Sequence, residues 1–238
     1  MKQNKTIHTS RTIMFAELSH VMNHGVENDD FDAILNANVT NKRSSDNLLK
    51  TNRYLKQLYG FDLEDIRFRC LKHYWKLVYN EKKSIITLLY AISNDFLLRE
   101  SIDVVINTRI GERVAIERFD ENIEKYHPGN YSANTRRSTA QNIASSWKQA
   151  GYIQGKVKNI RVQPEQDYFT VAFASLLSFL NGDRGDYILL SKSVKALALN
   201  TEDLRELIKE ASKRDLLQYQ YGGAVTVISF ENQIKTMQ

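Results

Sequence analysis

The spacing of apolar residues predicts a mainly helical protein. Through most of the chain these residues recur three and four positions apart, which is the period of an amphipathic helix, and only two prolines and ten glycines interrupt them. We expect helices at about 9–23, 29–36, 44–59, 63–79, 84–98, 100–107, 112–126, 132–150, 167–180, 191–199 and 201–217. Strand-forming residues at 156–162 and 218–230 predict two short β-hairpins. The expected fold class is therefore mainly α with short hairpins.

One break in this pattern suggests two domains. The sequence His127-Pro128-Gly129-Asn130 ends a helix, because the residue before a proline is pushed out of the helical region. We expect a helical domain at 1–127 and a second region at 128–238. In the first, a short helix, a polar break and a longer helix at 29–60 have the pattern of a helix-turn-helix. In the second, a helix followed by a hairpin occurs twice, at 131–164 and 186–231, as in winged-helix units.

The distribution of charge favours a polyanionic partner. The net charge is +5, and the stretch 125–164 contains lysine and arginine but no aspartate or glutamate, where roughly five acids would match the chain average. Surfaces usually intersperse the two signs, so a one-signed stretch is the pattern expected of a nucleic-acid binder. The alternative is a basic surface that has no partner.

Two groups of residues are the candidate contacts with double-stranded DNA. The helix at 44–59 carries cations opposite its apolar face, and the helix at 132–150 with its hairpin carries the second group. Small and amide side chains accompany the second group, and such residues hydrogen-bond phosphates or base edges. An ordinary amphipathic helix with a lysine-rich solvent side is the alternative for either group. The candidates are Arg43, Lys50 and Arg53 in the first group, and Arg136, Arg137, Gln141, Lys148, Lys156, Lys158 and Arg161 in the second.

The unit at 186–231 differs in charge from the unit at 131–164. Its helix carries four carboxylates, which would repel phosphate, at Glu202, Asp203, Glu206 and Glu210. We therefore expect this unit to pack against protein, and it supports an alternative function as an adaptor within a multiprotein complex.

Catalytic and cofactor motifs are not evident in the sequence. The single cysteine, Cys70, forms no thiolate cluster, His20 and His24 lack a third metal ligand nearby, and no serine–histidine motif stands out. The longest apolar runs, 85–92 and 171–180, are shorter than the roughly 20 residues of a membrane span. We expect a cytoplasmic protein without enzymatic activity, cofactor or membrane contact.

Four segments resemble the BrxA family of bacteriophage-exclusion (BREX) defence systems. They are the opening helix Arg11–Asn23, the stretch Asn38–Ser44, the stretch Leu88–Glu100, and Thr135 through Trp147 to Ile153. The resemblance implies a non-enzymatic helical protein that binds duplex DNA beside a methyltransferase, an ATPase and other BREX proteins. It also implies an N-terminal bundle similar to the antitermination factor NusB, which leaves RNA binding as a further alternative. It supplies no catalytic residues.

Overall fold

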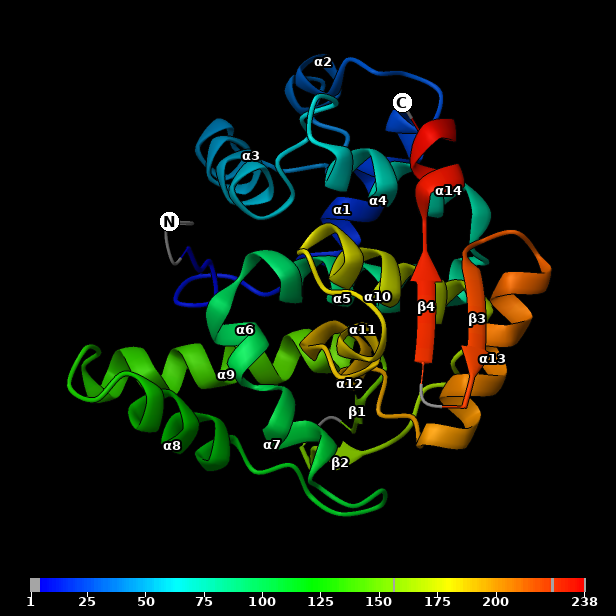
Figure 1. The fold of residues 1–238 in the computed structure, drawn as a ribbon. Helices are drawn as coiled ribbons and strands as arrows, with labels where there is room; N and C mark the ends of the chain where they lie inside the picture. The colour runs from blue at the N-terminus through cyan, green and yellow to red at the C-terminus, as the bar shows by residue number, and fades with distance from the viewer. Residues whose placement is uncertain (1–4, 156, 224, 238) are drawn as a thin grey trace.

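The computed structural model describes residues 5–155, 157–223 and 225–237 and is mainly helical (Figure 1). This confirms the expected fold class. The helices are α1 (Phe15–Gly25), α2 (Phe31–Asn36), α3 (Ser45–Tyr59), α4 (Ile66–Leu77), η1 (Asn80–Lys82), α5 (Lys83–Asn94), α6 (Phe96–Glu100), α7 (Ile102–Ile106), α8 (Ile116–Tyr126), α9 (Ala133–Gln149), α10 (Tyr168–Leu180), α11 (Asp186–Leu189), α12 (Lys192–Lys195), α13 (Thr201–Lys213) and α14 (Glu231–Thr236). The strands are β1 (Ile153–Gln154), β2 (Ile160–Arg161), β3 (Gln218–Gly222) and β4 (Val225–Ser229).

Two apolar helices, α5 and α10, form the centre of the molecule (Figure 1). They are buried along most of their length and pack against each other, and α10 also contacts α4, α12 and α13. A capping box starts α10, because the Asp167 carboxylate accepts from the Thr170 amide while the Thr170 hydroxyl accepts from the Asp167 amide. The more peripheral helices are amphipathic and cover this pair.

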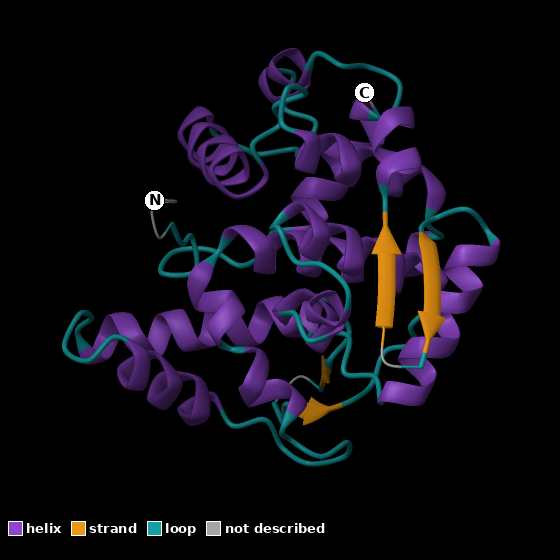
Figure 2. Ribbon diagram, in the orientation of Figure 1, coloured by secondary structure: helices purple, strands orange, loops and turns teal. Residues whose placement is uncertain are grey.

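The two hairpins are separate antiparallel pairs (Figure 2). The β1–β2 pair is short, with Ile153 opposite Arg161, and its turn depends on Gly155, where an added Cβ would overlap the Lys158 carbonyl oxygen. Backbone bonds from residues 111–114 complete its other edge, including Val114 N–H to Asn159 O at 2.7 Å. The β3–β4 pair is longer and confirms the hairpin expected at 218–230.

Several predicted helix boundaries were wrong. The first helix begins at Phe15 instead of near residue 9, because Met14 has φ 53° and interrupts a helical path. The helix expected at 84–98 divides at Asp95, whose carboxylate caps α6. The helix expected at 191–199 is only the short α12, and α11 and α14 were not expected.

The expected boundary at 127–128 lies within a helical hairpin. Helices α8 and α9, on either side of it, pack along each other, and buried residues from both predicted domains form one hydrophobic core. The two-domain division therefore stays a prediction. Similarly, α2 and α3 are joined by residues 37–44, a longer connection than the three or four residues of a helix-turn-helix.

None of the described helices is sufficiently long and apolar to cross a bilayer.

Candidate nucleic-acid interface

Helix α9 presents a face without acidic residues. Ser132 caps the helix by accepting from the Thr135 amide, and the buried stripe Ala140, Ile143, Ala144 and Trp147 is the one that the sequence predicted. At 100° per residue, Arg137, Gln141 and Lys148 lie within about 40° of one another, on a side of the helix about 90° from the centre of this stripe. All seventeen residues of α9 are uncharged or basic. We call the side chains of Arg137, Gln141 and Lys148 the α9 face.

The neighbouring residue Arg136 does not belong to this face. Its guanidinium lies 2.8 Å from a carboxylate oxygen of Glu124 and 3.4 Å from one of Asp120, both on α8. The sequence suggested an unshielded cation here, since no acid lies within the stretch 125–164. The structure corrects this, because the compensating carboxylates come from the helix just before that stretch.

The basic hairpin also contributes fewer free cations than expected. Arg161 is only 2% exposed, and its guanidinium donates to the carbonyl oxygens of Val105 and Val162 and to the amide oxygen of Gln163. Burial lowers the pKa of Arg161 below its usual value. The placement of Arg161 among surface phosphate contacts was therefore wrong. Lys158 is exposed.

Two further candidates at the hairpin have distinct positions. Lys148 is half-buried and donates from Nζ to the Gly155 carbonyl oxygen at 2.9 Å, so that it supports the hairpin turn while it still has two N–H donors. Lys156 lies outside the described residues.

Helix α3 provides a second exposed basic surface. Ser44 caps the helix, and Arg43, Lys50 and Arg53 are exposed, without a carboxylate in ion-pair distance in the described part of the chain. We call these three cations the α3 surface. The Arg53 guanidinium lies 4.8 Å from the centre of the Tyr54 ring, a cation–π contact that restrains it.

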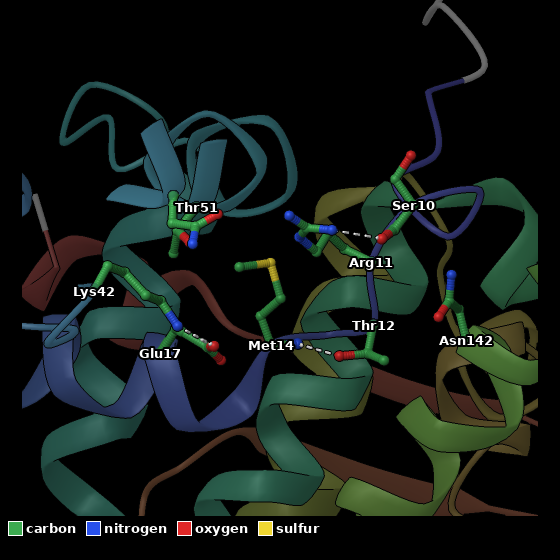
Figure 3. A pocket seen from close by; sticks show the side chains of 9 residues that line it. Ser10, Arg11, Thr12, Met14, Glu17, Lys42, Thr51 and Asn142 are labelled. Carbon is green, nitrogen blue, oxygen red and sulfur yellow. Dashed lines mark hydrogen bonds and ion pairs between the residues drawn. The ribbon is translucent and has the colours of Figure 1, made fainter. Parts of the chain in front are cut away.

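A cavity of about 350 Å³ lies between the two basic regions. Its walls come from the N-terminal segment before α1, the start of α1, the loop before α3, α3 itself and α9. Figure 1 shows the N-terminal segment between α3 and α9, and Figure 3 shows the cavity. The lining residues are Ser10, Arg11, Thr12, Met14, Glu17, Lys42, Asn47, Thr51 and Asn142.

This cavity is not evident from the amino-acid sequence. Its residues come from three separate stretches of the chain, 10–17, 42–51 and 142, which only the folded structure brings together. Arg11 is the most notable omission, because its guanidinium lies 4.9 Å from the centre of the same Tyr54 ring that Arg53 contacts. The neighbouring Ser10 side chain and the two guanidinium groups lower the pKa of Tyr54 below its usual value.

The side chains of a serine, a histidine and an aspartate are linked in a buried hydrogen-bonded series. Ser146 Oγ is 2.9 Å from His8 Nε2, and His8 Nδ1 is 2.8 Å from a carboxylate oxygen of Asp95. All three residues are fully buried, and Ser146 Oγ already bonds the Ile13 amide and the Asn142 carbonyl. A nucleophile must reach its substrate, so this arrangement supports the fold and offers no catalytic surface.

This hydrogen-bonded series of Ser146, His8 and Asp95 fixes the N-terminal segment between helices α6 and α9. Asp95 also accepts from the Ile7 and Leu98 amides, so that it holds the segment against the start of α6. Burial raises the pKa of this carboxyl group, but His8 and the amide donors outweigh burial and leave the pKa below its usual value. His8 and Ser146 complete the link to α9.

Among the described residues, no group of three or more histidine, cysteine, aspartate or glutamate side chains is placed to hold a metal ion. Comparisons with protein-family models, curated proteins and solved structures found no match.

Proposed function

We propose that this protein is a non-enzymatic double-stranded DNA-binding protein that uses the α9 face and the α3 surface. One observation carries the proposal: the exposed side of α9 combines Arg137 and Lys148 with uncharged hydrogen-bonding side chains and has no carboxylate. Phosphate is the group that such a surface attracts, whereas few of its side chains are arranged for bidentate contacts with bases. Binding should therefore show little sequence preference.

We further propose, from the resemblance to BrxA alone, a cytoplasmic role in a BREX defence complex. The partners in that setting would be DNA, a methyltransferase, an ATPase and associated BREX components. In such a complex this protein would bind the DNA duplex, and other components would catalyse the reactions.

Fluorescence anisotropy with a labelled duplex at several salt concentrations tests DNA binding. Among the candidate contacts in the described part of the chain, the exposed cations are Arg43, Lys50, Arg53, Arg137 and Lys158. If about five phosphates are neutralised, log K should fall with log salt at a slope of about −4 to −5. Absent binding, or binding that salt does not weaken, would contradict the proposal.

A matched pair of double variants tests the surface. Arg137→Glu with Lys148→Glu reverses two cations of α9, and we expect duplex affinity to fall at least about tenfold, or about 1.4 kcal/mol. Lys209→Glu with Lys213→Glu makes the same charge change on α13, so it controls for net charge. Equal losses in the two variants would show that overall charge, and not the α9 face, determines binding.

A second function, as a protein–protein adaptor, has its own supporting observation. Around α11 and β4, which pack together, the side chains of Tyr187, Leu190, Val225 and Val227 are exposed. Exposed apolar side chains of this kind favour a protein partner. Co-purification with and without nuclease separates the functions, because partners that remain after nuclease treatment are held by protein contacts.

Competition between labelled duplex DNA and RNA for the same site tests the RNA-binding alternative.

A further inference from the structure

The cavity between α3 and α9 has two chemically different ends (Figure 3). Arg11, Ser10 and Thr12 lie at one end, and Lys42 with Glu17 at the other, with Met14 between them. The chemical difference between the two ends indicates which part of a ligand would bind at each.

The Arg11 end presents hydrogen-bond donors. The Arg11 guanidinium stacks on Tyr54 and donates one bond to the Ser10 carbonyl oxygen at 3.0 Å, while its other N–H groups have no carboxylate partner in the described part of the chain. The Thr12 hydroxyl accepts from the Met14 amide and from the Gln149 side chain, at 3.1 and 2.9 Å. Its own proton is therefore available to a ligand. A cation with an adjacent hydroxyl donor favours a phosphate group.

The opposite end presents acceptors and is unsuitable for a second anion. Lys42 Nζ lies 2.8 Å from a Glu17 carboxylate oxygen. Burial raises the pKa of Glu17, but Lys42 and hydrogen bonds outweigh it, and the pKa lies below its usual value. Glu17 is therefore ionised at neutral pH. A carboxylate held in this way accepts hydrogen bonds from hydroxyl or amino groups.

Thr51 and Met14 complete the cavity. Thr51 is 5% exposed, and its hydroxyl has no hydrogen bond within the residues that the structure describes, although it lines the cavity. This hydroxyl is open to the cavity and can hydrogen-bond a ligand there. Met14 has φ 53°, a strained conformation for a residue other than glycine, and its thioether lies at the centre of the cavity. A thioether packs well against a flat ring.

We propose that this cavity binds a nucleoside monophosphate, with its phosphate at Arg11 and Thr12 and its hydroxyl- or amino-bearing part at Glu17 and Thr51. The volume of about 350 Å³ lies at the lower end of small-molecule sites. The ligand is either a free nucleotide or the 5′-phosphorylated end of a DNA strand, which share this chemistry. The proposal does not rest on duplex binding by the α9 face.

Isothermal titration of the full-length protein with AMP, adenosine and inorganic phosphate tests the inference. We expect AMP to bind at least about tenfold more tightly than adenosine, because only AMP engages Arg11. AMP should also bind more tightly than phosphate, which does not reach Glu17. Equal affinity for AMP and adenosine, or no binding of AMP at millimolar concentration, would overturn the proposal.

Three variants test the position of the ligand. Arg11→Gln should reduce AMP affinity at least about tenfold, and Thr51→Val, which keeps the side-chain shape, should reduce it several-fold. Arg53→Gln is the matched control, since Arg53 contacts the same Tyr54 ring but does not line the cavity. Unchanged AMP affinity in Arg11→Gln and Thr51→Val, or an equal loss in Arg53→Gln, would exclude this cavity as the site.

A second titration distinguishes a free nucleotide from the 5′-phosphorylated end of a DNA strand as the ligand. Short single-stranded oligonucleotides with and without a 5′-phosphate are compared in the wild type and in Arg11→Gln. A gain that requires both the 5′-phosphate and Arg11 identifies a strand end as the ligand. Equal affinity of the two oligonucleotides, with AMP still bound through Arg11, identifies the free nucleotide. The Arg137 and Lys148 reversal should leave AMP affinity unchanged, so failure of either proposal is recognised separately.

Discussion

A helix followed by a β-hairpin occurs twice in the chain, and the two units use their charged residues differently. In the unit with α13 and the β3–β4 hairpin, cations and carboxylates neutralise one another on the helix and at its end: Glu210 pairs with Lys213 and with Arg214, the residue that follows α13. In the unit with α9 and the β1–β2 hairpin, the helix has no acids. Similar local architecture therefore gives one surface with balanced charge and one that is basic.

The comparison also shows that a cation in the sequence need not be available at the surface. Arg136 and Arg137 are adjacent, yet Arg136 pairs with α8 while Arg137 is exposed. Arg161 and Lys158 lie in the same hairpin, yet only Lys158 is exposed. Pairing and burial, and not position within a basic stretch, decide which charges can meet a phosphate.

The largest expected effect concerns the buried link that holds the basic unit to the N-terminal segment. Asp95→Ala breaks the pair with His8 and removes the α6 cap, and we expect the free energy of unfolding to fall by about 3–5 kcal/mol, because one partner of a buried pair is left alone. Urea denaturation measures this. The matched variant Asp203→Ala, in the acidic unit, should cost far less because Asp203 is exposed. Equal costs would mean that the buried link contributes little.

The same pair predicts how stability depends on pH. The pKa of Asp95 in the folded protein is below its usual value of 3.8. Its contribution to stability is therefore complete above about pH 4 to 5 and is lost as pH falls through the folded-state pKa. Asp95→Ala should remove part of this acid dependence. An unchanged slope between pH 5 and 2 would show that other carboxyl groups cause the acid sensitivity.

The next effect separates the two cations of the basic hairpin. Arg161→Met leaves the Val105 carbonyl and the Gln163 side chain without their donor, and we expect a loss of about 2–3 kcal/mol in the free energy of unfolding. Lys158→Met should change it by less than about 0.5 kcal/mol, because Lys158 is exposed. The affinity for duplex DNA should show the reverse order. When affinity is calculated for the folded protein alone, only Lys158→Met should weaken binding.

A smaller effect distinguishes the adjacent arginines. Arg136→Gln removes partly exposed ion pairs, so that stability should fall by about 0.5–1 kcal/mol with little change in duplex affinity. Arg137→Gln should leave stability within about 0.5 kcal/mol and weaken duplex binding several-fold. Thermal unfolding and anisotropy measure the two quantities. If Arg136→Gln weakens DNA binding as much as Arg137→Gln, Arg136 exchanges its α8 partners for phosphate.

The parts of this fold that the sequence predicted depend on nearby residues. Ser132 as the cap of α9, its buried stripe through Trp147, and the β3–β4 hairpin all follow from local spacing. What could not be predicted depends on residues distant in the sequence. The partners of Arg136 lie on α8, those of Arg161 include Val105, and the cavity joins residues from Ser10 to Asn142. Charge pattern indicates a basic region, but only the packing decides which cations remain free.

The smallest expected effect is the difference between the stability losses caused by removing the caps of α9 and α13. Ser132 and Asn200 each accept a hydrogen bond from the amide three residues later, and alanine at either position should cost about 1 kcal/mol. The two losses should still differ, because Glu202 and Asp203 stabilise the N-terminal dipole of α13, whereas the first turn of α9 has no acid. We therefore expect the greater loss in Ser132→Ala, measured by thermal unfolding at low ionic strength. Added salt should reduce the difference, since it screens the carboxylates of α13 but leaves the cap hydrogen bonds intact. A difference that persists at high salt would mean that local packing, and not the missing acids of α9, distinguishes the two helices.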